Sequence, residues 1–139
     1  MPPPSARVQA ICDFSGPTDL RKFAQSPGDL GHARADSPDS KLLGSPVPDR
    51  PAPAQRANPI TSAGPGDPLF LILHGSADPI VPPQQRTRLH AALLAVHIPS
   101  THRTVASAKH GGPEFSTAVA DEVDAFFRRS FRLPLATKP

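Results

Sequence analysis

Residues 69–82 read LFLILHGSADPIVP, and they are the most informative part of the 139-residue chain. Its first five residues are all apolar, and such an unbroken run predicts a strand buried on both faces, as in a parallel sheet. The run ends at His74-Gly75, and the next turn carries one carboxylate, Asp78. Because open α/β sheets place their functional groups at the carboxyl ends of strands, this turn is the first candidate site.

A second candidate loop reads Lys109-His110-Gly111-Gly112 and places a histidine in a flexible turn. The two glycines permit tight backbone geometry beside the imidazole. An acid followed by a histidine, each on a loop after a strand, matches the second half of a Ser…Asp…His triad in α/β-hydrolase order.

Strands and helices alternate along the predicted chain. We expect strands over residues 7–14, 69–73 and 101–106, and helices over 18–23, 37–44, 83–96 and 114–131. This alternation predicts parallel strands with helices on both faces, an α/β three-layer sandwich. The proline-rich residues 45–68 are expected to run over the surface as an irregular excursion.

Composition excludes several other kinds of protein. The net charge is only +3, and Arg128, Arg129 and Arg132 at a predicted helix end are better explained by the helix dipole than by nucleic acid. No apolar stretch approaches the length of a membrane span and no signal-peptide pattern is present, so we expect a soluble protein of undetermined compartment. A lone cysteine, Cys12, excludes an intrachain disulfide and is expected to be a small buried residue.

Polar residues outside the two loops have structural explanations. His74 should bond to a neighbouring backbone group, while Asp13 and Asp19 should cap a helix or brace a turn. The histidines at 90, 97 and 102 have no carboxylate or cysteine at ligand spacing, so we expect no metal and no cofactor.

Four segments, in order, carry a resemblance to a known family: CDFSGPTDL (12–20), SPDSKLLG (37–44), LHGSADPIVP (73–82) and KHGGPEF (109–115). They resemble the C-terminal part of an esterase/lipase-type α/β-hydrolase, close to acetyl-xylan and feruloyl esterase-like enzymes and their peptidase relatives. The resemblance implies a single partial domain over residues 1–139, with the three strands side by side at one edge of a larger sheet. It also implies that Asp78 is the triad acid and His110 the general base.

The rest of the family's machinery is missing from this sequence. Neither G-x-S-x-G nor an HGGG-type loop occurs. Ser15, Ser45 and Ser76 each adjoin a glycine, but none has the flanking glycine pair or is expected between a strand and a helix. The chain alone is therefore predicted to be inactive, and its unpaired sheet edge is expected to favour self-association.

The resemblance implies that the complete parent hydrolyses small carboxylic esters, acylated carbohydrates among them, through an acyl-serine intermediate. One alternative is a serine peptidase relative, because the same triad serves both reactions. Another is a non-catalytic fragment that folds on a partner chain. A disordered proline-rich interaction protein would explain residues 45–68 but not the buried strands, and it ranks last.

Overall fold

The computed structural model describes residues 7–26, 31–115 and 119–134. Its strands are β1 (Ala10–Phe14), β2 (Leu69–Gly75) and β3 (Ser100–Val105). They form a parallel sheet in the order β1-β2-β3, so β2 lies in the centre. The predicted strands, their direction and their adjacency are confirmed, although β1 begins later than expected and β2 continues through His74-Gly75.

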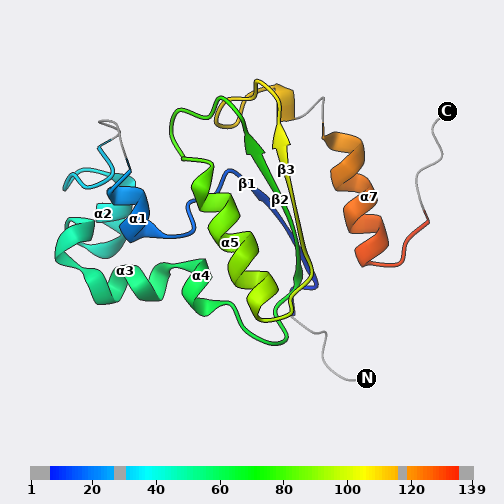
Figure 1. Ribbon diagram of the computed structural model, residues 1–139, viewed down its shortest axis with the longest axis horizontal. Helices are drawn as coiled ribbons and strands as arrows, with labels where there is room; N and C mark the ends of the chain where they lie inside the picture. Colours follow the sequence, from blue (N-terminus) through cyan, green and yellow to red (C-terminus); the bar gives the residue numbers. More distant parts are fainter. Residues whose placement is uncertain (1–6, 27–30, 116–118, 135–139) are drawn as a thin grey trace.

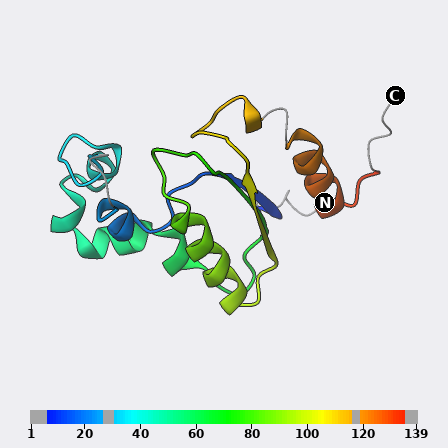
Figure 2. The ribbon, with the colours of Figure 1, turned by 45° about the horizontal axis from the view of Figure 1, so that its top comes forward.

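Helices lie on both sides of this sheet, as the sequence predicted (Figure 1). One face is covered by α5 (Gln84–Ala95) and the other by α7 (Ala120–Ser130), an arrangement also visible in Figure 2. The segment between β1 and β2 forms a group of short helices at one end of the molecule. These are α1 (Leu20–Ala24), α2 (Pro38–Leu43), the 3₁₀ helix η1 (Val47–Asp49), α3 (Pro51–Ala57) and α4 (Pro59–Ser62).

Strand β2 divides the apolar interior into two cores. Ile72 packs with Leu89 of α5, whereas Leu71 and Leu73 pack with Phe126 of α7. Successive strand residues point to opposite faces, so an unbroken apolar run supplies both cores. The expected burial of this strand on both faces is thereby confirmed.

Capping residues begin the two short helices where the sequence predicts them. The Asp19 carboxylate accepts the backbone N–H of Lys22 at the start of α1. The Ser37 hydroxyl accepts the N–H of Ser40 in α2, which ends at Gly44 with a positive φ of 77°. Both helices therefore carry local signals that do not depend on tertiary packing.

The expectation of an irregular excursion over residues 45–68 is wrong, because η1, α3 and α4 all lie within it. Each of these helices has proline in its first turn, where the missing N–H has no intrahelical partner to lose. Val47 and Ala54 are buried there in a small core with Leu20 and Leu43. Proline in this segment starts helices instead of preventing them.

The single helix predicted over residues 114–131 is also wrong. Helix α7 begins only at Ala120, and Val119 before it has a non-helical φ of −128°. Residues 116–118 lie outside the described ranges. Val119, with a ψ of −3°, is neither helical nor extended, and its side chain is buried against the sheet together with that of Phe115. Burial of both side chains is achieved without a continuous helix.

Two buried carboxamides attach the short helices to the rest of the fold. The Gln85 Oε1 atom, at the start of α5, accepts the backbone N–H groups of Thr18 and Asp19, both at 2.8 Å. The Asn58 Oδ1 atom accepts the N–H of Leu20 at 2.7 Å. Because buried backbone N–H groups need partners, these side chains fix the path of the chain from β1 into α1.

We predict that Ile72→Ala lowers the free energy of unfolding by about 2–5 kcal/mol, because it opens a cavity between β2 and α5. Ile72 is fully buried, whereas Leu42 on α2 is 71 % exposed. The matched control Leu42→Ala should therefore change stability by roughly 0.5 kcal/mol or less. Urea unfolding followed by circular dichroism measures both, and equal losses would contradict the central position of β2.

Candidate functional site

The loops after β2 and β3 meet at the carboxyl end of the sheet. A Cβ atom on Gly75 would lie 2.2 Å from the carbonyl oxygen of Ala108, so only glycine fits there. The backbone N–H of Ser76 donates to the Val105 carbonyl at 2.9 Å, and that of Ala77 donates to the Ala108 carbonyl at 3.0 Å. These bonds fix the first loop against the second.

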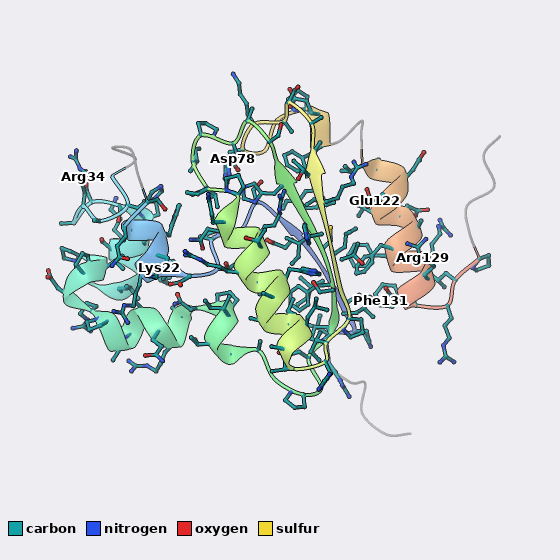
Figure 3. All side chains as sticks on the ribbon, in the orientation of Figure 1. Lys22, Arg34, Asp78, Glu122, Arg129 and Phe131 are labelled. Carbon is teal, nitrogen blue, oxygen red and sulfur yellow. The ribbon has the colours of Figure 1, made fainter. Side chains whose placement is uncertain are left out.

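Asp78 and His110 come together across these two loops. The His110 Nδ1 atom lies 3.0 Å from the Asp78 Oδ2 atom. The Asp78 side chain is fully buried, whereas that of His110 is 37 % exposed. Figure 3 shows Asp78 near the start of α5, at the end of the sheet toward which β2 and β3 point. Both residues singled out from the sequence therefore lie in one site.

The surroundings of Asp78 favour its ionised form. Burial alone would raise the pKa of this carboxyl, but the backbone N–H groups of Val81 and Ile80, and then His110, outweigh burial and leave the pKa below its usual range. Both N–H groups donate to Asp78 Oδ1 at 2.9 Å. An ionised Oδ2 can only accept, so the His110 Nδ1 atom carries the proton of that bond.

This hydrogen bond leaves the other ring nitrogen of His110 as the proton acceptor. In a neutral imidazole with its proton on Nδ1, the Nε2 atom holds the free lone pair. Among the residues that the structure describes, none forms a hydrogen bond to this Nε2 atom. The contact with Asp78 therefore orients the imidazole and leaves Nε2 as its acceptor nitrogen, on a side chain that is partly exposed.

The remaining sequence-predicted residues have the structural contacts expected of them. His74 is buried, and its Nε2 atom lies 2.8 Å from the Val81 carbonyl oxygen. Asp13 accepts the backbone N–H of Gly16 at 3.1 Å, and Asp19 caps α1. Gly111 has a positive φ of 67°, in keeping with the tight turn predicted beside His110.

One residue of the site was not found from the sequence. The His32 Nε2 atom lies 3.3 Å from the Ile80 carbonyl oxygen, and its Nδ1 atom lies 3.2 Å from Asp39 Oδ2. His32 belongs to a segment in which hydrophobic residues do not recur at the spacing of a helix or a strand. No sequence signal links it to a turn 48 residues away.

Candidate nucleophiles in the described ranges are poorly placed. Ser15 does lie between a strand and a helix, with a φ of 53°, which corrects the expectation that no such serine exists. It is nevertheless 1 % exposed and forms no bond to His110. Ser76 accepts the N–H of Ser107. Burial, followed by Asp13 and Glu122, raises the pKa of the half-buried Cys12 thiol to about 11, so it stays protonated at neutral pH.

The described part of the chain contains no cluster of three or more metal-ligating side chains. His90 and His102 pack edge to face at 4.5 Å. Burial, then His90 and Arg86, lowers the pKa of His102. Within the same ranges, no helix combines the length and the apolar character needed to cross a bilayer.

Comparison with known protein families identifies the family of this chain. Residues 2–93 match the family model BD-FAE, and this span is more than half of the sequence. The chain belongs to that family, which is a feruloyl esterase-type α/β-hydrolase family. The matched span contains Asp78 and ends before His110. No curated protein sequence matches the chain.

Several solved structures share the fold. A truncated carbohydrate esterase from gut microbiota is 25 % identical, with a TM-score of 0.73 over 88 % of this chain and 42 % of that one. A bifunctional GH43-CE protein from Bacteroides eggerthii is 29 % identical, with a TM-score of 0.78 over 93 % of this chain and 16 % of that one. A Mycobacterium tuberculosis puromycin-hydrolyzing peptidase is 24 % identical, with a TM-score of 0.73 over 91 % of this chain and 19 % of that one. At this identity the likeness supports the fold alone. The chain thus spans less than half the length of each.

We predict that Asp78→Asn destabilises the fold at neutral pH and that this loss shrinks in acid. The folded-state pKa of Asp78 lies below its ordinary value of 3.8. Its ionised form therefore adds stability above that ordinary pKa, and this stability is lost as pH falls through the lower folded value. Urea unfolding over a pH series measures the difference between the two proteins.

The exposed Asp49 supplies the matched control, because Asp49→Asn removes a carboxylate with little burial. Its effect on stability at neutral pH should be smaller than that of Asp78→Asn. An Asp78→Asn difference that stays constant into strong acid would contradict a lowered pKa for Asp78.

Proposed function

We propose that this chain carries the acid and the general base of a serine hydrolase that cleaves carboxylic esters. The observation that supports this most is the 3.0 Å contact between His110 Nδ1 and Asp78 Oδ2 at the carboxyl end of a parallel sheet. Membership of a feruloyl esterase-type family supports ester hydrolysis as the reaction. The substrate class is a small carboxylic ester, with acylated carbohydrates as the leading candidates.

The proposed chemistry follows from the orientation of the imidazole. The His110 Nε2 atom takes the proton of a serine hydroxyl as the serine oxygen attacks the ester carbonyl carbon. The protonated His110 then gives this proton to the departing alkoxide as the ester C–O bond breaks, leaving an acyl-serine. Water, activated by the same nitrogen, releases the acid and regenerates the serine. Asp78 keeps the imidazole in the required tautomer and stabilises its cation.

We assign the serine and the oxyanion donors to a polypeptide segment outside the described residues. The sequence has no G-x-S-x-G, and each neighbouring structure is more than twice as long as this chain. Among the described residues β1 and β3 are both edge strands, and the resemblance to α/β-hydrolases implies that such a segment would add its strands at the outer edge of β1. Without that segment, the same edge is available to a second copy of the chain.

Two alternatives rank below this proposal. A peptidase would use the same pair of residues, but the peptidase structures resemble this chain at less than 25 % identity. A non-catalytic module that only docks on a partner would not need a buried, ionised carboxylate oriented toward a histidine. The Asp78–His110 geometry favours hydrolysis.

The test begins with the DNA upstream of the Met1 codon, where we expect an in-frame segment encoding G-x-S-x-G. The protein expressed with that segment should hydrolyse 4-nitrophenyl acetate and label with a fluorophosphonate. His110→Ala should lower kcat by roughly 10⁶-fold, and Asp78→Asn by roughly 10⁴-fold.

His90→Ala is the matched control, because His90 lies on α5 and its ring bonds to Ser100 of β3, away from the Asp78–His110 pair. Its kcat should equal that of the parent protein. Full ester turnover by the His110→Ala protein would exclude His110 as the base. Fluorophosphonate labelling of the 139-residue chain itself would show that its nucleophile has been overlooked.

A further inference from the structure

The turn formed by residues 78–81, which we call the acid turn, makes unusual use of its backbone. The N–H groups of Ile80 and Val81 both donate to Asp78 Oδ1. The carbonyl oxygens of the same two residues each face a histidine, Ile80 toward His32 and Val81 toward His74. The Ile80–Val81 peptide is thus held at both ends, its carbonyl oxygen by His32 and its N–H by Asp78, and the next carbonyl along the chain is held by His74.

His74 holds the acid turn from within the sheet. It lies in β2, is fully buried, and places Nε2 2.8 Å from the Val81 carbonyl and 3.4 Å from Asp78 Oδ2. Its Nδ1 atom is buried and has no hydrogen-bond partner in the described part of the chain. Because Nε2 faces only acceptors, the ring proton belongs on Nε2, and His74 donates toward the turn.

His32 holds the same turn from the group of short helices. Its Nε2 atom faces the Ile80 carbonyl at 3.3 Å, while its Nδ1 atom faces Asp39 Oδ2 at 3.2 Å. The ring also packs on Phe23 of α1, with 3.7 Å between ring centroids. A carboxylate and an aromatic ring therefore fix the imidazole that contacts the turn.

We propose that His74 and His32 are positioning residues that hold the acid turn, and through it the Asp78 carboxylate, in the orientation that pairs with His110. If the Ile80 carbonyl is released by His32, the Ile80–Val81 peptide can rotate and withdraw the Val81 N–H from Asp78 Oδ1. If the Val81 carbonyl is released by His74, the end of the acid turn is no longer fixed to β2. In either case the carboxylate is less firmly oriented toward His110. The catalytic consequence rests on the proposed function, whereas the orientation of the pair does not.

The experiment uses the full 139-residue chain and reads the ring nitrogens of His110 by ¹⁵N NMR at alkaline pH, where the imidazole is neutral. The parent chain should carry the proton on Nδ1. His74→Leu and His32→Leu each remove an imidazole that contacts a carbonyl of the acid turn, and both should shift the His110 ¹⁵N resonances toward the form protonated on Nε2. His74→Gln and His32→Gln supply a replacement N–H and should restore the parent resonances.

His90→Leu is the matched control, since His90 contacts Ser100 and His102 instead of the acid turn. A histidine with only a structural role would lower the free energy of unfolding without moving the His110 resonances of the folded protein. Folded leucine variants with unchanged His110 resonances would overturn the proposal. If His74→Leu does not fold, the proposal is tested at the partly exposed His32 instead, by comparing the His110 resonances of the His32→Leu and His32→Gln proteins.

This readout requires no catalysis, so the two proposals can fail separately. Shifted resonances in a protein without esterase activity would support the positioning role and contradict the proposed function. Ester hydrolysis by the protein expressed with its upstream segment, together with unshifted His110 resonances in the variants, would support the proposed function and contradict the positioning role.

Discussion

The close approach of Gly75 to the Ala108 carbonyl oxygen is the constraint on which the candidate site depends. Strand β2 is central, so its carboxyl end must share one edge of the sheet with the end of β3. A side chain at position 75 would separate the two loops that follow. The Asp78–His110 contact joins these loops, so the absence of one Cβ atom allows an acid on one loop to reach a base on the other.

The acid turn shows how a buried carboxylate can stay ionised. Removing a carboxylate from water is costly unless hydrogen-bond donors replace the lost solvent. Asp78 receives two backbone N–H groups on one oxygen and His110 on the other. The donors come from a short turn whose own carbonyls are paired with His74 and His32. Ionisation and orientation of this carboxylate thus have the same cause.

Local patterns allowed much of this structure to be predicted. The apolar run of β2, the caps of α1 and α2, and the two loop residues Asp78 and His110 each carry a signal within a few neighbouring positions. Proline density in residues 45–68 predicts an extended chain, whereas the position of proline, in the first turn of α3 and of α4, decides the structure that forms. His32 could not be predicted at all, because its contact with Ile80 depends on how α1 and α2 pack beside the sheet.

The hydrogen bonds that orient the Asp78–His110 pair come from this chain itself. Asp78 is held by its own turn and by His110, and β2 has apolar cores on both faces from α5 and α7. Gln85 and Asn58 fix the path from β1 into the short helices by bonds within the same chain. Under the proposed function, a segment that adds to the edge of β1 would therefore not need to create the Asp78–His110 geometry. It would have to place a serine hydroxyl at His110 Nε2 and donors around the developing oxyanion, so the register of its strand against β1 would be the decisive variable.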